Sequence, residues 1–459
     1  MTYWAVKNLD RDGLKRQVCD AIEARAEEIM EIGKTIWETP EPGYKEYKTA
    51  ELVASKFREL GLEVETGVGI TGVIAKIKGS QARPNIAVQG ELDALIIPEH
   101  PEADEKYGAV HACGHNAQIT NVIALAMGLV DTGAMKELDG TVTLMGVPSE
   151  EPIEIEWRQQ MREEGKLFFL GGKQEFIKAG KFDDVDISFI DHMGGGPDIK
   201  ISVRSAKPAP GSDGFVAKMI TFKGAEAHSG GAPWLGVNAL NACMLGLMGI
   251  HAQRETFKDA DAIRVHQIIT KGGDSVNVVP SDVRMEMMVR GATVEAIKDA
   301  SMKVDRAFKA GAMAVGGEVE IITIPGYLPS PGVKPAKLYS ILYENAVALL
   351  GEKNVGKGRR QQGLVKVPSG VVADSADVAS IIPHGGLGVS GSEGRGHSRE
   401  YRIVDPYNAY VVPAKIYAMA IIDLLADGAV AAKEIIAEFT PVVTKEDYMA
   451  YWKDILGDQ

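Results

Sequence analysis

The sequence predicts an α/β protein in which a smaller ferredoxin-like domain interrupts a larger α/β domain. Short apolar runs alternate with helical patterns up to about residue 207 and again after about residue 330, which is typical of a mainly parallel sheet covered by helices. The segment between them has the order β-α-β-β-α-β of the split βαβ arrangement. We therefore predict a discontinuous domain made of residues 1–207 and 328–459, and an inserted domain at residues 208–327.

The larger domain opens with an amphipathic helix, predicted over residues 14–37, where apolar side chains recur every three or four positions. Two further helices are predicted at residues 121–129 and 171–179. Four apolar runs predict strands, and their sequences are GVIAKIKG, NIAVQGEL, TVTLMGVP and DISFIDHM.

The inserted domain shows a change of pattern from about residue 208. In VRMEMMVR, the side chains of Val283, Met285, Met287 and Val289 share one face of a strand. The other predicted strands are AKMITFKG, IRVHQIIT and EVEIITI, and the helices are WLGVNALNACMLGLMGIH and TVEAIKDASMKVDRAFKAGA. The alternative, two sequential domains, would leave residues 330–459 as a third unit with few strands of its own.

Composition excludes several classes of protein. The 459 residues contain 50 Lys and Arg against 63 Asp and Glu, a net charge of −13 that argues against a nucleic-acid partner. Three cysteines cannot form a disulfide framework, which favours a reducing compartment. The N-terminal residues show no secretory signal, and the most apolar late stretch is interrupted by Asp423 and Asp427. We expect a cytoplasmic protein with no membrane partner.

The sequence GVGITG at residues 67–72 satisfies the glycine spacing of a dinucleotide-binding loop. A strand-like sequence follows it, however, where binding of a phosphate requires the N-terminus of a helix. We therefore interpret it as a hairpin turn.

Five polar motifs stand where predicted strands end, the place at which sites assemble in open α/β sheets. They are GELDAL (90–95), HACGHN (111–116), PSEEP (148–152), DHM (191–193) and GRGHSREY (394–401). Each motif has a simpler explanation, such as a buried cysteine beside a structural histidine or a solvated pair of glutamates. Together they offer thiolate, imidazole and carboxylate groups that suit two metal ions, namely Cys113, His115, Glu151, His192 and His397. Two divalent ions with one thiolate and one carboxylate would leave a charge of about +2 to polarise a carbonyl.

The glutamate pair in PSEEP suggests a division of labour. One carboxylate can bind metal while its neighbour, Glu150, takes a proton from water, as hydrolysis requires.

In this order, together with GAEAHSGGAP and GGDSVNVVP, the motifs resemble the aminoacylase–carboxypeptidase family of dinuclear metallopeptidases and amidohydrolases. The branch that looks most similar contains p-aminobenzoyl-glutamate hydrolase and the auxin-conjugate amidohydrolases, in which a cysteine bridges the metals. The resemblance runs from the first helix to about residue 425. It implies a catalytic domain, an inserted lid that forms a homodimer, and hydrolysis of an amide.

The resemblance also implies roles for individual residues. Cys113, His115, Glu151, His192 and His397 would be metal ligands and Glu150 the general base. His228 of the lid would stabilise the oxyanion in the partner subunit, and Asn277 and Arg290 match positions that hold the substrate. From the residues alone, the simpler interpretation is preferred, in which His228 is a loop histidine, Asn277 a turn residue and Arg290 the end of a surface strand. Asn116 and Glu91 depart from the auxin-conjugate pattern, and residues 153–173 form an extended polar insertion that could reshape the rim of the pocket.

We therefore expect a homodimeric two-metal amidohydrolase that cleaves an N-acyl or N-aroyl amino acid, a substrate with an amide and a carboxylate. Manganese or zinc would serve as the metal, with cobalt as a further option. Two alternatives stay open: a metal-dependent aminohydrolase that releases ammonia from an activated arylamine, and a non-catalytic relative that binds metal or amino acids.

Overall fold

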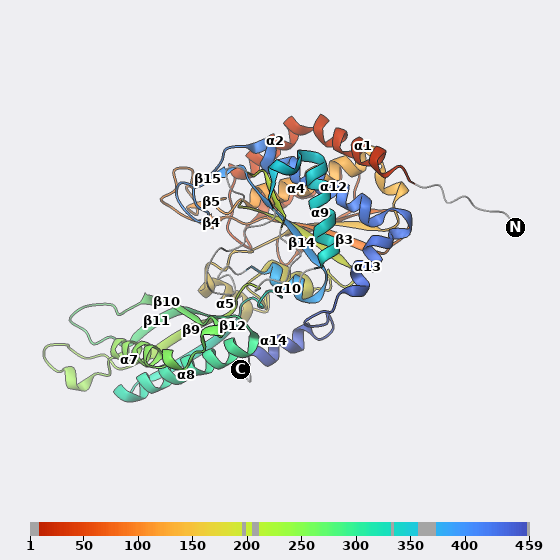
Figure 1. The fold of residues 1–459 in the computed structure, drawn as a ribbon. Coiled ribbons are helices and arrows are strands. Elements are labelled where there is room, and N and C mark those ends of the chain that lie inside the picture. Colours follow the sequence, from red (N-terminus) through yellow and green to blue (C-terminus); the bar gives the residue numbers. More distant parts are fainter. Residues whose placement is uncertain (1–8, 195–198, 204–210, 332–334, 357–372, 457–459) are drawn as a thin grey trace.

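The computed structural model describes residues 9–194, 199–203, 211–331, 335–356 and 373–456. The chain forms a large α/β body from which a smaller, elongated lid extends to one side (Figure 1). The predicted fold class, an α/β domain with an inserted ferredoxin-like lid, is confirmed. The predicted boundary at 207/208 lies outside the described residues.

The body is built on an eight-stranded mixed sheet, in which the four central strands are parallel, the last two strands at one edge are also parallel, and the other three pairings are antiparallel. The predicted mainly parallel sheet is found in four of the seven strand pairings. The strands β1 and β2 are antiparallel because a tight turn joins them. This turn contains GVGITG, as expected. In spatial order the strands are β1 (Val64–Val68), β2 (Gly72–Lys78), β6 (Thr141–Val147), β3 (Asn85–Glu91), β7 (Ile187–Met193), β14 (His384–Val389), β8 (Ile201–Val203) and β13 (Val355–Gly356).

Helices cover both faces of this sheet. On the face remote from the lid in Figure 1, α4 (His115–Thr132) packs on the central strands, and α1 (Arg11–Ala24), α2 (Ala26–Trp37) and α12 (Val412–Leu425) pack against α4. The face towards the lid packs against α6 (Gly172–Lys178) and α10 (Ser375–Ile381). The remaining helices and short strands of the body are α3 (Tyr47–Glu59), α5 (Ile155–Glu163), α9 (Ala336–Leu350), α11 (Pro406–Tyr410), α13 (Val430–Glu438), α14 (Tyr448–Leu456), β4 (Leu95–Ile96), β5 (Ala109–Val110), β15 (Ser392–Glu393) and β16 (Arg402–Ile403).

The expectation of one helix over residues 14–37 is wrong, because the structure has two helices that meet at Arg25. The backbone of Arg25 leaves the helical region at φ −106° and ψ 10°. Val18, Ile22, Ile29 and Ile32 are buried on both sides of the break, so the apolar spacing continues across it and cannot reveal it.

The lid is a four-stranded antiparallel sheet with two helices, in the predicted order. The helix α7 packs along α8, and both cover one face of the sheet. The elements are β9 (Gly214–Lys223), α7 (Ala239–Ala252), β10 (Arg264–Lys271), β11 (Asp282–Gly291), α8 (Val294–Val315) and β12 (Glu318–Pro325). Strand β10 lies at the edge of this sheet.

The C-terminal helix α14 packs against α8 and β12, so the chain returns to the lid after completing the body. Tyr448 and Trp452 of α14 both hydrogen-bond to the buried Asp377 of α10. The stretch Pro406–Leu425 is long and apolar enough to cross a membrane, but 94% of its most apolar 18 residues are buried inside the protein, as in a core helix.

Candidate metal centre

The predicted ligands come from loops and strand ends that meet beside the parallel centre of the sheet. Cys113 lies in the loop between β5 and α4, and His115 is the first residue of α4. Gly114 between them has φ +86°, and a Cβ there would lie 2.4 Å from Met193 Cγ, so a glycine is required. Glu150 and Glu151 follow β6, His192 lies near the end of β7, and His397 follows β15.

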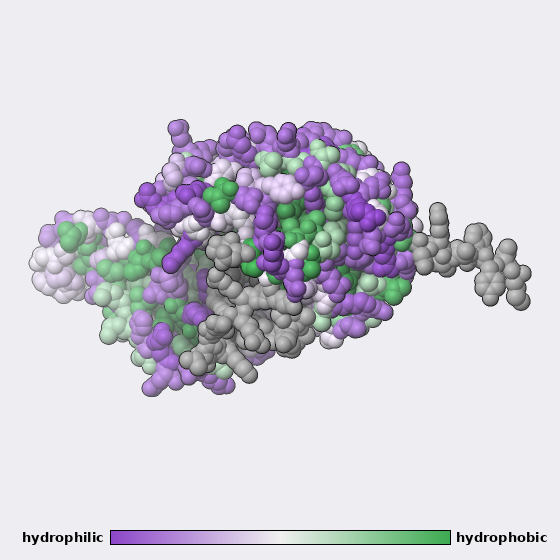
Figure 2. All heavy atoms as spheres, turned by 45° about the horizontal axis from the view of Figure 1, so that its top comes forward, coloured by the Kyte–Doolittle hydropathy of each residue, from purple (hydrophilic) through white to green (hydrophobic). Residues whose placement is uncertain are grey.

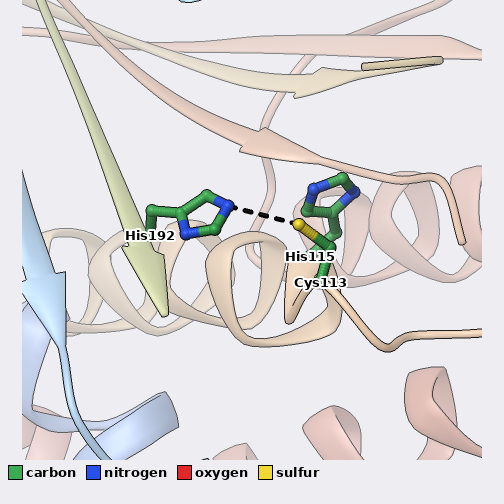
Figure 3. Close-up of side chains that lie close together, drawn as sticks. All are labelled: Cys113, His115 and His192. Carbon is green, nitrogen blue, oxygen red and sulfur yellow. Dashed lines mark hydrogen bonds between the residues drawn. The ribbon is translucent and has the colours of Figure 1, made fainter. Parts of the chain in front are cut away.

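The structure brings the five predicted ligands into two groups that share Cys113. Cys113, His115 and His192 form one group, and Cys113, Glu151 and His397 form the other. Figure 3 shows the first group, with His192 Nε2 lying 3.3 Å from Cys113 Sγ. In the second group, His397 Nε2 lies 3.0 Å from Glu151 Oε1.

These separations fit ligands of a common ion. Metal–ligand bonds of about 2.0–2.3 Å place two atoms bound to the same ion roughly 3–3.7 Å apart. Within the described residues, His115 Nε2 and Glu151 Oε1 are buried yet make no hydrogen bond. Buried polar atoms that make no hydrogen bond are rare, and an ion held between each of them and its neighbouring ligand atom would satisfy them. The donor set therefore fits two divalent metals.

The ring of each buried histidine is oriented by its second nitrogen. His115 Nδ1 lies 3.0 Å from the carbonyl oxygen of Asp93 and 3.1 Å from its Oδ1, and His192 Nδ1 lies 2.6 Å from the carbonyl oxygen of Met193. When Nδ1–H donates to these oxygens, Nε2 keeps its lone pair for a metal. Asp93 Oδ2 also accepts the backbone N–H of Glu151 at 2.9 Å, so one buried carboxylate positions both groups.

The charged groups alter one another's acidity. Burial opposes ionisation of Cys113, but the imidazoles of His192 and His115 outweigh it and hold the pKa of the thiol well below its usual range. Burial likewise opposes ionisation of Asp93, yet His115 and the neighbouring N–H groups lower the pKa of Asp93 to about 2. A thiolate and an ionised aspartate are the states in which these residues serve a metal.

Glu150 is held by its backbone rather than by its side chain. The hydroxyl of Tyr327 donates to the carbonyl oxygen of Glu150. The preceding Ser149 has a left-handed φ of +51°, and its N–H donates to buried Glu46 at 2.8 Å. Burial raises the pKa of Glu150 well above its usual range, and the negative charges of Glu91 and Glu151 raise it further. Such a carboxylate is suited to hold a proton.

The three predicted lid residues do not meet within one chain. His228 and Asn277 lie in adjacent loops, where the N–H of Ser229 donates to the carbonyl oxygen of Asn277 at 3.0 Å. Arg290 is eight residues along β11 from Asp282, opposite Phe215, at the other end of the sheet. At about 3.3 Å per residue the two ends are roughly 26 Å apart.

Comparison with known proteins agrees with this architecture. Residues 211–314 match the peptidase dimerisation domain of the M20 type. The thermostable carboxypeptidases 1 and 2 of Saccharolobus solfataricus are each 30% identical over 274 residues, which cover 57% of this chain and 63% of theirs. The chain therefore contains a dimerisation domain of the M20 type and is similar to carboxypeptidases over 57% of its length.

Further M20 relatives have more specific names. Hippurate hydrolase of Campylobacter jejuni is 27% identical, with 71% of this chain and 80% of that protein covered. One of the subunits of the p-aminobenzoyl-glutamate hydrolase of Escherichia coli is 28% identical, with 66% and 59% covered. The alignments span 63–65% of the length of the first curated relatives.

The M20 fold is also seen in solved structures. A dinuclear metal-binding M20 peptidase of Bacillus subtilis aligns with a TM-score of 0.61 at 23% identity, covering 88% of this chain and 99% of that one. The aminobenzoyl-glutamate utilization protein of Klebsiella pneumoniae aligns with a TM-score of 0.63 at 18% identity, covering 91% and 98%. The resemblance inferred from the sequence motifs is thereby confirmed.

Sequence reasoning missed three buried charged residues beside the ligands: Glu91, Lys173 and Asp374. Glu91 and Lys173 contact each other, and Glu91 also lies within 4.8 Å of His115 and Glu150. In the sequence, Glu91 stands out only as a departure from the family pattern, and Lys173 belongs to a polar insertion. The signal available was a lysine directly after the apolar run LFFLGG, where a solvated side chain is not expected.

Proposed function

We propose that this protein is a two-metal amidohydrolase that cleaves the amide bond of an N-acyl or N-aroyl amino acid. The observation that carries the proposal is the pair of ligand groups sharing Cys113, with buried Glu150 at their side. Glu150 is in neither group that shares Cys113 but forms a third group with Glu91 and His115, and it lies 3.9 Å from His115 Nε2, where a base beside the ions could take a proton from water.

The residues would divide the reaction as follows. Bound divalent ions would polarise the amide carbonyl and make water more acidic. Glu150 takes the proton from the attacking water and later gives it to the leaving amine. Asp93 keeps His115 and Glu151 in place, and Tyr327 fixes the backbone of Glu150. No other acid is needed, because the same carboxyl group carries the proton in both steps.

The substrate class follows from charge and from the names of the relatives. Hippurate, p-aminobenzoyl-glutamate and the indoleacetic acid conjugates of amino acids are all N-acyl amino acids with a free carboxylate. A protein of net charge −13 needs a local positive centre to bind such an anion. The ions, and Arg290 at the body end of the lid sheet, would supply it.

For the metal we propose zinc or manganese, with cobalt as a substitute. Thiolate and imidazole favour zinc, whereas carboxylate-containing dinuclear sites also accept manganese. Cys113, Cys19 and Cys243 are free thiols, which suits the reducing cytoplasm that we propose as the compartment.

We propose that two copies pair through the lid, which would bring His228 and Asn277 to the partner's metal centre. Apolar side chains gather on the lid, at the left of Figure 2. They include strongly exposed residues of the loops and of the outer surfaces of α7 and β10, namely Trp234, Leu235, Met248, Ile268 and Val276. An exposed apolar group beside an edge strand is typical of an interface between subunits.

Mixing two inactive variants tests this pairing. The His228→Ala chain has an intact Glu150 in its own metal centre. In a hybrid dimer, the Glu150→Gln chain contributes its intact His228 to that same centre. In a hybrid dimer one of the two sites is then complete, so an equal mixture should recover about a quarter of the wild-type activity. Mixtures that stay inactive after subunit exchange would contradict the contribution of the partner.

The proposed reaction is tested by metal analysis together with a substrate screen. We expect two divalent ions per chain and release of a carboxylic acid and an amino acid from benzoyl-, aminobenzoyl- or indoleacetyl-amino acids. Ammonia without a carboxylic acid would instead indicate an aminohydrolase. Metal-loaded protein without turnover on the whole panel would indicate a binding protein.

A further inference from the structure

Lys173 is a fully buried lysine that the insertion at residues 153–173 carries into the body of the protein. Its side chain is 0% exposed, and Nζ lies 2.5 Å from Glu91 Oε1 and 2.5 Å from Asp374 Oδ1. The backbone N–H of Lys173 also donates to Asp374 Oδ2 at 3.0 Å. Charges removed from water require partners of this kind, so the three side chains hold one another in a single arrangement.

The start of α6, where Lys173 lies, is docked on the turn that carries the glutamate pair. The N–H of Gly172 donates to the carbonyl oxygen of Ser149 at 3.1 Å. A Cβ at position 172 would lie 1.9 Å from the carbonyl oxygen of Pro148, so only glycine permits this approach. Lys173 is therefore held at a set distance from the metal centre.

Glu91, the last residue of β3, links Lys173 to the metal centre. One carboxylate oxygen, Oε1, contacts Lys173, and the other, Oε2, lies 3.0 Å from His115 Nε2. Within the described residues, neither Glu91 Oε2 nor His115 Nε2 makes a hydrogen bond, although both are buried. An imidazole nitrogen with its lone pair and a carboxylate oxygen repel at this distance unless a proton or a metal ion lies between them.

On the basis of the two-metal site proposed above, we propose that Glu91 is a sixth metal ligand, sharing with His115 the ion of the first group. Lys173 and Asp374 are its positioning residues. The 3.0 Å between Glu91 Oε2 and His115 Nε2 matches the separation of two atoms bound to one ion.

This assignment changes the charge of the site. Cys113, Glu151 and Glu91 would contribute −3 against +4 from two divalent ions, which leaves about +1 rather than about +2. Lys173 and Asp374 cancel each other and add no net charge. Lys173 contacts Oε1, which leaves Oε2 as the oxygen that Glu91 would offer to the ion.

Metal affinity tests the proposal without depending on activity. Wild type, Glu91→Gln, Lys173→Met and Lys218→Met are loaded with Co²⁺ or Zn²⁺, and ions per chain and dissociation constants are measured by elemental analysis and chelator competition. Lys218 is the matched control, because it is a fully buried lysine of the lid paired with Asp305 at 2.7 Å. We expect Glu91→Gln and Lys173→Met to raise the dissociation constant of one ion by at least about 10-fold and to leave that of the other ion as in wild type. Lys218→Met should bind both ions with wild-type affinity.

The visible absorption of the Co²⁺ protein supplies a second readout. Glu91→Gln should alter the ligand-field bands of one ion and leave the thiolate-to-cobalt band of Cys113 in place. Two ions bound with wild-type affinity and unchanged bands in Glu91→Gln would overturn the proposal, since a proton would then fill the space between Glu91 and His115. Wild type without bound metal would overturn the proposed function itself. If Lys173→Met does not fold, the nearly isosteric Glu91→Gln variant decides alone.

Discussion

Replacing Glu150 by glutamine should remove the proton carrier and leave the rest of the site intact. The side chain keeps its size, and the backbone stays tied to Tyr327. Glu150 is in neither of the two ligand groups that share Cys113, and glutamine keeps a side-chain oxygen in the third group, with Glu91 and His115, so metal binding should persist. Loss of a positioned acid–base group lowers the rate by about 10²–10⁴-fold, or about 2.7–5.4 kcal/mol at 1.36 kcal/mol per decade.

The assay is kcat/KM on the best substrate of the screen, accompanied by metal content and thermal unfolding. Glu41→Gln is a matched control, because Glu41 and Glu150 are both 8% exposed. Glu41 accepts the backbone N–H groups of Lys48 and Thr49 at the start of α3, and its loss should change kcat/KM by less than 10-fold. A Glu150→Gln protein with two ions per chain and kcat/KM within 10-fold of wild type would refute the role of Glu150.

Three other predictions concern metal, stability and pH. Cys113→Ser should lower the binding affinity for both ions because both ligand groups contain Cys113, whereas His192→Ala should lower it for one ion only. Equal loss of affinity in the two variants would contradict a shared Cys113. Trp452→Ala should lower the free energy of unfolding by about 3–5 kcal/mol in urea titrations. Trp452→Phe should cost only about 1 kcal/mol, because Tyr448 still donates to Asp377. Burial, aided by the charge of Asp93, raises the pKa of Glu46 from 4.5 to about 8. Between pH 4.5 and pH 8 the folded state therefore keeps a proton on Glu46 that the unfolded state has lost. The free energy of unfolding should fall by up to about 1.4 kcal/mol per pH unit as the pH rises through this range. Glu46→Gln, measured beside wild type with chelator at pH 5, 6, 7 and 8, should lack this slope; a constant difference between the two proteins would show that Glu46 does not titrate there.

The elements that sequence patterns predicted well are those whose buried faces are continuous. The lid strand VRMEMMVR alternates strictly, and its register against β9 follows without a shift. The break at Arg25 was missed, because apolar side chains recur at helical spacing on both sides of it. The antiparallel edge of the large sheet was missed for a similar reason, since an apolar run does not record the direction of its neighbours.

The ligands were accessible to sequence reasoning because each is a chemically distinctive residue in a short motif at a strand end. Glu91 and Lys173 were not, since a glutamate after a strand and a lysine in a polar insertion are usually solvated. Their contact joins positions 82 residues apart, and the contact of Lys173 with Asp374 joins positions 201 apart.

By itself, the sequence determined the fold class, the order of elements in the lid and the residue types of a metal centre, because periodic burial and short motifs are local properties of a chain. Only the tertiary structure decided that Cys113 belongs to both ligand groups, that Arg290 lies at the opposite end of the lid from Asn277, and that Lys173 holds Glu91 against His115. These are distances between segments remote in the chain, and the packing of the body and the lid sets them, not any one segment.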